Sequence, residues 1–126
     1  MRPVSSDTFS SGDLLETVGA EIDILTELRQ IFGDEAARLL GDVLAGLASN
    51  DANRVRIGAH TLKTVVANVG GRASRNLATA MEEAARAPVP DFEIMNKLSA
   101  ELTKEVEALR VAFEAYVTEL ANGASA

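Results

Sequence analysis

The sequence predicts an all-α fold, an up-down antiparallel four-helix bundle with one or two short extra helices at the N-terminus. Three observations predict it. Apolar residues recur at three- and four-residue steps through most of the chain, as they do along the buried face of a helix. No segment alternates apolar and polar residues in the way of a half-buried strand. Connections between the helical segments are short, which makes successive helices antiparallel neighbours.

One domain is expected between two short flexible ends. The chain has 126 residues, a length that fits a single domain with its own core. The first dozen residues contain four serines with proline and glycine, and the chain ends in the small polar run NGASA. Such ends have little to bury. We therefore expect a flexible leader over 1–12, the helical bundle over 13–121 and a flexible tail over 122–126.

The first half of the bundle is expected to contain three helical segments. Asp13 is a plausible N-cap for the first, and Gly19 is expected to divide a short helix from a longer one. Gly33 is expected to end the longer helix at Phe32, because glycine commonly follows a helix C-terminus. Asp34 can then cap the next segment, which ends near residues 49–51.

The second half is expected to contain three further helices. One begins around Ala52 and ends before Gly70, and another runs from about Ala73 to Arg86. Two prolines in residues 87–90 then break the chain. Asp91 can cap the last helix, which has the clearest pattern: its apolar seam is Phe92, Met95, Leu98, Leu102, Val106, Leu109, Phe113, Val117 and Leu120.

Composition excludes several classes of function. The chain has 12 Lys and Arg against 19 Asp and Glu, four Phe, one Tyr and no Trp. It therefore lacks the basic surface and stacking rings of a nucleic-acid-binding protein, and its charge opposes docking on an anionic membrane. With one His and no Cys, neither a metal nor another cofactor is expected. The N-terminus has no secretory h-region, so we expect a cytoplasmic protein.

The single histidine, His60, has the most informative position in the chain. On its helix, one stripe is expected to face the bundle, formed by Val55, Gly58, Ala59, Leu62, Val66 and Val69. At 100° per residue, His60 lies on nearly the opposite side and points at water. Its neighbours at three and four residues are Arg56, Ile57, Lys63 and Thr64.

An exposed histidine allows two interpretations. It is most often a solvated surface residue, and Arg56 and Lys63 are then ordinary solvated charges. Alternatively, His60 is a nucleophile that accepts a phosphoryl group, since an imidazole in water titrates near pH ~6.5 and is mostly the free base at neutral pH. Lys63 can supply the cation that phosphoryl transfer needs. Nothing else in the chain is expected to bind ATP or Mg²⁺, so the donor's chemistry belongs to another protein.

The residues around His60 resemble a family signature. Ala59-His60-Thr61-Leu62-Lys63, followed by Ala67-Asn68-Val69-Gly70, looks like the AHTLKG-x-x-x-N-[LIV]-G motif of histidine-containing phosphotransfer (HPt) domains. Asp51 stands where the family often has a helix-opening Asp, and residues 81–86, MEEAAR, resemble its later LE-x-AAR stretch. The resemblance covers roughly Ile22 to Leu109.

This resemblance implies a four-helix phosphocarrier of two-component phosphorelays, without an ATP site of its own. His60 is expected to pass a phosphoryl group between Asp residues of receiver domains, which belong to response regulators or hybrid histidine kinases. Lys63 is expected to stabilise the phosphoryl oxygens. The receiver is expected to dock on the face around His60, contacting Arg56, Ile57, Thr64, Ala67 and Asn68. The chain is expected to be a monomer, with no nucleic acid or membrane as partner.

One departure from the family pattern leaves alternatives open. The residue after the Lys is usually Gly, and here it is Thr64, which lies beside the imidazole and borders the approach of a receiver. Either the partner accommodates Thr64, or its hydroxyl bonds the phosphoryl group, or transfer is impaired. A degenerate HPt-like module that binds a receiver without carrying phosphate is therefore the alternative function. A dimerisation or coiled-coil element built on the last helix is a third. An independent enzyme is disfavoured, because an open helix face makes no pocket.

Overall fold

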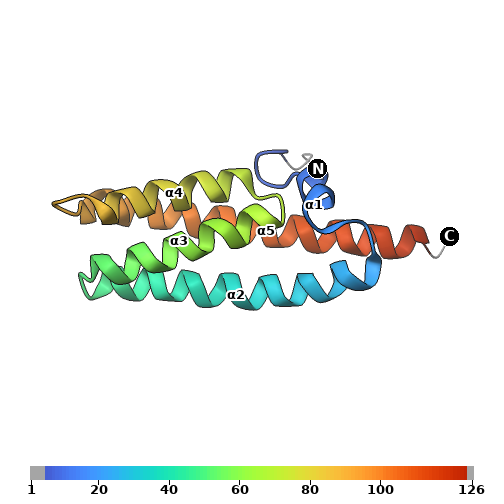
Figure 1. The fold of residues 1–126 in the computed structure, drawn as a ribbon, viewed down its shortest axis with the longest axis horizontal. Helices are drawn as coiled ribbons and strands as arrows, with labels where there is room; N and C mark the ends of the chain where they lie inside the picture. Colours follow the sequence, from blue (N-terminus) through green and yellow to red (C-terminus); the bar gives the residue numbers. More distant parts are fainter. Residues whose placement is uncertain (1–4, 125–126) are drawn as a thin grey trace.

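The computed structural model describes residues 5–124 and is all-α over that range, as the sequence predicts. Its helices are α1 (Ser11–Val18), α2 (Ile22–Ala48), α3 (Ala52–Asn68), α4 (Arg72–Arg86) and α5 (Phe92–Ala124). The four long helices alternate in direction along the chain, and α1 lies beside the turn between α3 and α4 (Figure 1). No helix in the described range is long and apolar enough to span a membrane.

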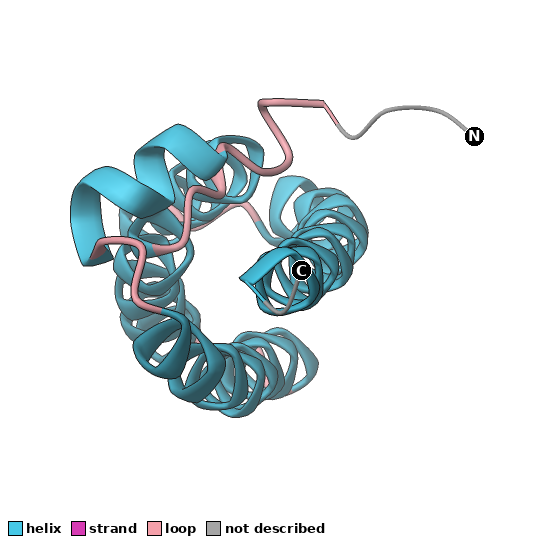
Figure 2. Ribbon diagram, turned by 90° about the vertical axis from the view of Figure 1, so that its right-hand side faces the viewer, coloured by secondary structure: helices cyan, strands magenta, loops and turns pink. Residues whose placement is uncertain are grey.

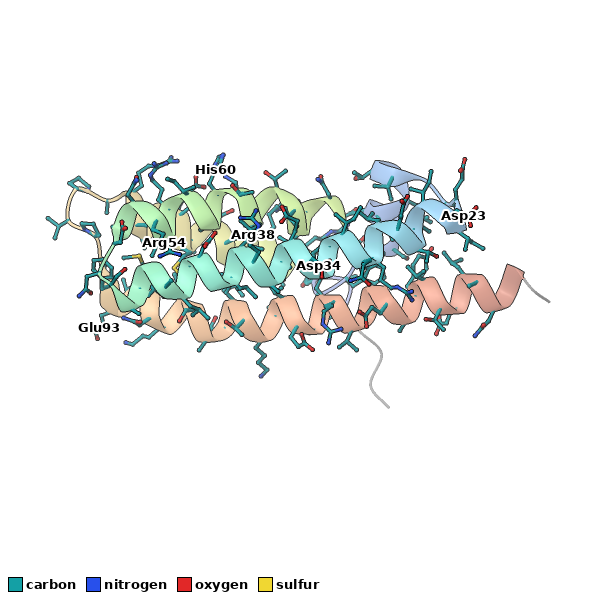
Figure 3. The ribbon with its side chains drawn as sticks, turned by 90° about the horizontal axis from the view of Figure 1, so that it is seen from below. Asp23, Asp34, Arg38, Arg54, His60 and Glu93 are labelled. Carbon is teal, nitrogen blue, oxygen red and sulfur yellow. The ribbon has the colours of Figure 1, made fainter. Side chains whose placement is uncertain are left out.

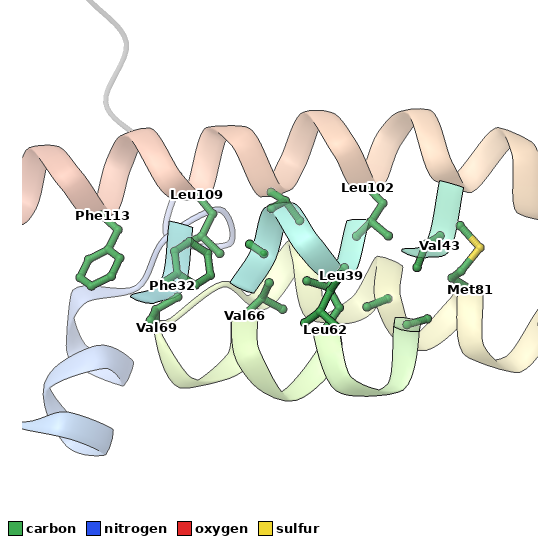
Figure 4. Close-up of a cluster of buried hydrophobic side chains, with 14 of the residues drawn as sticks. Phe32, Leu39, Val43, Leu62, Val66, Val69, Met81, Leu102, Leu109 and Phe113 are labelled. Carbon is green, nitrogen blue, oxygen red and sulfur yellow. The ribbon is translucent and has the colours of Figure 1, made fainter. Parts of the chain in front are cut away.

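The long helices surround one apolar core. α2 packs against α3 and α5, and α4 packs against the same two helices, so α3 and α5 lie on opposite sides of the ring that they form (Figure 2). Side chains from all four interleave, among them Leu39, Leu62, Met81 and Leu102 (Figure 4). The central part of the α5 seam lies in this core, with Leu102, Leu109 and Phe113 fully buried. That face is therefore not open for a coiled coil with another chain.

The predicted break at Gly33 is wrong, because α2 continues through it to Ala48. Glycine inside a helix costs only about 1 kcal/mol relative to alanine, and Phe32 and Ala36 bury their side chains on either side of it. Asp34 is not a cap: its carboxylate accepts a hydrogen bond from Gln30 Nε2 at 3.3 Å within the helix. Packing of α2 as a single element overrides the local stop signal.

The expected division at Gly19 is confirmed, whereas the cap before it differs. Gly19 follows α1 with φ 80°, a left-handed conformation that glycine adopts without strain. The N-cap of α1 is Ser10, whose hydroxyl accepts from the Asp13 backbone N–H at 3.2 Å. Capping by Asp51 and Asp91 is as predicted, since their carboxylates accept from backbone N–H groups three residues later at 3.1 Å.

Some residues of the expected leader contact the bundle, and part of the expected tail is helical. Of the leader over 1–12, residues 1–4 lie outside the described range, but Phe9 packs against the ring of Tyr116, with centroids 5.5 Å apart. The Ser10 N–H donates to Gly70 O at 2.8 Å. Of the tail over 122–126, residues 122–124 continue α5. Aromatic and backbone contacts that composition does not reveal hold the first segment on the bundle.

Candidate functional site

His60 lies on the outer side of α3, at the edge of the molecule (Figure 3). Of its side-chain surface, 59% is exposed, while Val55, Leu62 and Val66 on the other side of the helix are fully buried. The helical spacing in the sequence predicts this orientation. Asp51 caps the N-terminus of α3, because its side chain accepts from the Arg54 backbone N–H.

A carboxylate from the neighbouring helix holds the His60 ring. His60 Nδ1 lies 2.6 Å from Glu82 Oε2 on α4. An ionised carboxylate has no hydrogen to donate, so Nδ1 must carry the hydrogen of this bond. In the neutral ring, Nε2 then keeps a free lone pair. The contact therefore selects the tautomer in which Nε2 is the nucleophilic atom.

Glu82 is a buried charge with three partners. Its residue surface is only 3% exposed. Besides His60, it accepts from Lys63 Nζ at 2.8 Å and from the Arg86 guanidinium at 2.9 Å. The hydrogen bond from Lys63, helped by that from His60, lowers the pKa of Glu82 below its ordinary 4.5 in spite of burial. Glu82 is therefore ionised at neutral pH, and its partners offset the cost of burying the charge.

Lys63 and Arg86 place two cations beside the imidazole. Their side chains are 30% and 62% exposed, so both reach the surface on which His60 lies. An ammonium carries three donor hydrogens and a guanidinium five. The Lys63 ammonium and the Arg86 guanidinium each donate one hydrogen bond to Glu82. With the His60 ring neutral, the charges of Lys63, Arg86 and Glu82 add up to one net positive charge.

Sequence reasoning singled out His60 and Lys63 but missed Glu82 and Arg86 as site residues. Both lie in the 81–86 stretch that supports the family resemblance. The available signal was a glutamate four residues before an arginine at the edge of the apolar face of α4, a spacing that favours an ion pair. That the pair meets His60 depends on how α3 and α4 align, which is a property of the fold.

The residues predicted to meet a partner all lie on α3, on the surface around His60. Ile57 is 51% exposed, Thr64 and Asn68 are exposed, and Arg56 and Ala67 are partly buried. The Arg56 guanidinium bonds to Asn53 Oδ1 at 2.8 Å, away from the Glu82 cluster. The face therefore combines an open imidazole with apolar and small side chains.

A shallow groove between α2 and α3 continues this face. It has a volume of about 150 Å³, and Asn68 is one of the residues that line it. Its apolar walls include Leu28 and Ile31 of α2 and Val65 of α3, and Ile31 is 55% exposed. The surface beside His60 thus extends from α3 onto α2.

Between residues 5 and 124, no group of three or more His, Asp or Glu side chains could hold a metal ion.

Comparisons with known proteins show which family and which fold this chain resembles. The family model described as "Hpt domain" matches residues 27–112, a range that includes all four residues of the His60 cluster. A crystal structure of the HPt domain from a sensor hybrid histidine kinase of Shewanella is similar, with a TM-score of 0.76 and 17% sequence identity. The similarity covers 91% of this chain and 97% of that one. A comparison with curated protein sequences finds no match.

Proposed function

Because the chain belongs to the Hpt domain family, whose members are phosphocarriers that interact with receiver domains in two-component phosphorelays, we propose that His60 carries the phosphoryl group. The observation that supports this most directly is the 2.6 Å contact of His60 Nδ1 with Glu82. It leaves the lone pair of Nε2 free on an exposed surface. A ring held in this way needs no general base to become a nucleophile.

The transfer itself is a displacement at phosphorus. Nε2 of His60 attacks the phosphoryl group of an aspartyl phosphate on the receiver. The P–O bond to the aspartate breaks with its electron pair on the carboxylate, and an N–P bond forms. Lys63 and Arg86 stabilise the charge on the transferring oxygens, because positioning and electrostatics dominate phosphoryl transfer. The reverse reaction delivers the group to the Asp of a second receiver.

The receiver docks on the exposed face of α3. Ile57 supplies an apolar contact on one side of His60, and Thr64 and Asn68 extend the surface toward the groove at α2. Ala67 extends it toward Arg75 of α4. Arg56 lies at the border of this face with its guanidinium at the surface. The site has no enclosing walls of its own, so the receiver's surface completes it and excludes water.

Phosphoryl transfer from labelled receivers tests the proposal. The wild-type chain is expected to take up label that is acid-labile and base-stable, as an N-phosphoryl bond is, unlike an acyl phosphate or a phosphoester. His60→Gln is expected to keep the helical circular dichroism and lose all label. Glu83→Gln, at an exposed position of α4 outside the surface assigned to the receiver, is the control and is expected to keep label. Label on the His60→Gln chain would contradict the proposal, and binding without any label on wild type would identify a degenerate module.

A further inference from the structure

We propose that Glu82 keeps a proton on Nδ1 of His60 through the whole phosphoryl cycle, so that the ring is loaded and unloaded without exchanging protons with water. The inference rests on the proposed function, since it concerns the state of His60 while it carries phosphate. It assigns Glu82 as a positioning residue that acts through the imidazole.

The geometry that supports this is the isolation of the Nδ1 side of the ring. Glu82 Oε2 lies 2.6 Å from Nδ1, and the Glu82 side chain is only 4% exposed. Water therefore has little access to the carboxylate that accepts the hydrogen bond from Nδ1. In a Ser-His-Asp triad, a buried carboxylate in the same relation to Nδ1 stabilises the imidazolium that forms. Glu82 has the same geometry for a ring that becomes cationic by phosphorylation.

Loading makes the ring a cation. The Nε2 lone pair forms the N–P bond, and the electron pair of the broken P–O bond leaves with the receiver's aspartate. With Nδ1–H in place, the phosphorylated ring carries one positive charge, which faces the negative charge of Glu82. In an environment shielded from water, such a charge-assisted hydrogen bond is stronger than its neutral counterpart. The proton therefore stays on Nδ1.

Unloading benefits from the same proton. When the group moves to a second aspartate, the N–P bond breaks and its electron pair returns to Nε2. A cationic ring leaves as neutral imidazole, whereas a ring without the Nδ1 proton must leave as an imidazolate anion or first take a proton. Neutral imidazole is the far better leaving group. The proton that Glu82 retains thus keeps phosphorylated His60 a reactive donor.

The other charged groups around His60 do not replace this role. On α3, Lys63 bonds to Glu82 and Arg56 bonds to Asn53. On α4, Arg86 bonds to Glu82. Arg75 lies about two turns before Glu82, beside Ala67. The charges of α2 near α3 bond to one another and to Arg54: Arg38 with Glu35 and Asp42, and Asp42 with Arg54. The cations beside the ring would favour loss of the Nδ1 proton, and Glu82 opposes them.

A glutamine in place of Glu82 would remove the effect with little change of shape. Its amide oxygen can accept from a protonated Nδ1, and its amide N–H can donate to an unprotonated one. The glutamine amide therefore does not favour a protonated over an unprotonated Nδ1, and it places no negative charge beside the cationic ring. Glu83, the next residue on α4, is exposed. Glu83→Gln is the matched control, because it removes the same charge without touching the ring.

Nuclear magnetic resonance on the wild-type chain gives the first test and needs no variant. The chain has one histidine, so ¹⁵N-histidine labelling reports on this ring alone. Phosphoramidate, a small-molecule donor, loads the ring independently of any receiver. At pH ~8.5, where a ring that titrates near ~6.5 keeps its proton in about one molecule in a hundred, Nδ1 of phosphorylated His60 is expected to remain protonated. A phosphorylated ring that has lost this proton overturns the inference.

The pH profile of transfer to a receiver gives the second test. The transfer rate of Glu82→Gln is divided by that of Glu83→Gln at each pH. This ratio is expected to fall by about tenfold or more between pH ~6.5 and pH ~8.5. The wild-type rate relative to the same control is expected to stay constant. Parallel profiles for all three chains overturn the inference alone. Loading by phosphoramidate without any transfer to or from receivers overturns the proposed function, and the resonance experiment still decides the protonation of the ring.

Discussion

At the residue scale, Lys63 owes its importance to the burial of its partner. A solvated surface lysine can be replaced at a cost of at most about 0.5 kcal/mol. Lys63, however, donates to the buried Glu82 carboxylate, and a hydrogen bond to a charged group contributes about 1.5–3 kcal/mol. Lys63→Ala is therefore expected to lower the free energy of unfolding by about 1–3 kcal/mol at neutral pH, as well as to slow phosphoryl transfer. Urea denaturation measures the loss.

The same substitution has a predictable pH dependence. The pKa of Glu82 is lowered from 4.5 in the folded chain, with Lys63 as the largest cause. A carboxylate of this kind contributes stability above its ordinary pKa, and the contribution is lost as the pH falls through the lowered value. The difference between wild type and Lys63→Ala is thus expected to be constant above about pH 5 and to shrink below 4.5. A difference that does not change in acid would remove Glu82 as the cause.

Thr64 tests where the receiver docks. It is exposed on α3 four residues after His60, a spacing that places the two Cβ atoms roughly 5–6 Å apart. Thr64→Gly is expected to reduce stability by about 0.5–1 kcal/mol and to transfer phosphate at least as fast as wild type. Thr64→Leu is expected to keep its melting temperature and transfer slowly. Transfer rates with one receiver decide this, and equal rates for all three chains would move the docking surface elsewhere.

Some properties of the site residues could be predicted from the sequence of one helix, and others depend on how two helices pack together. The exposure of His60 was predictable, because it depends only on the rotation between residues of one helix. The role of Glu82 was not, since its contacts with His60 and Lys63 span 22 and 19 residues of sequence. The sequence shows which residues lie on each face of α3 and of α4, but the alignment of the two helices along their axes follows from packing in the whole core.

At the scale of the element, α2 shows how packing outweighs a local signal. Gly33 followed by Asp34 has the composition of a helix end and a new cap, yet the helix continues. Phe32 and Leu39, on either side of this point, are almost fully buried, and burial of each such side chain is worth about 1.5–3 kcal/mol. A break would displace these side chains from the core. The free energy lost in that way exceeds the cost of glycine inside a helix, so the helix continues.

Gly33 therefore offers a stabilising substitution. A Cβ at this position would meet no atom within 4 Å, and alanine is favoured over glycine inside a helix by about 0.5–1 kcal/mol. Gly33→Ala is expected to raise the melting temperature by a few degrees. Gly46→Ala, in the same helix, is the control: its Cβ would lie 2.8 Å from Val55 Cγ2 and 3.0 Å from the Val55 backbone N. That chain is expected to melt lower. A loss of stability in Gly33→Ala would mean that α2 requires a flexible point there.

At the scale of the whole molecule, the N-terminal segment packs away from the proposed transfer site. His60 and its cluster lie between α3 and α4. The N-terminal segment instead lies at the turn that joins these helices and along α5 (Figure 1). Gly70 in that turn has φ 82°, and a Cβ there would lie 2.3 Å from Ser10 O. The segment thus fits closely on a part of the bundle that no proposed step of transfer uses.

Phe9 provides the test of this separation. Its ring lies 6.1 Å from that of Phe113 and 5.5 Å from that of Tyr116, and each such aromatic pair contributes about 0.5–1.5 kcal/mol beyond the area it buries. Phe9→Ala is expected to lower the free energy of unfolding by about 2 kcal/mol, and Phe9→Leu by less. Both chains, assayed well below their melting temperatures, are expected to accept label on His60 at the wild-type rate. If Phe9→Ala melted normally, the first segment would not be bound to the bundle in solution. If it melted normally but transferred slowly, the segment would belong to the docking surface instead.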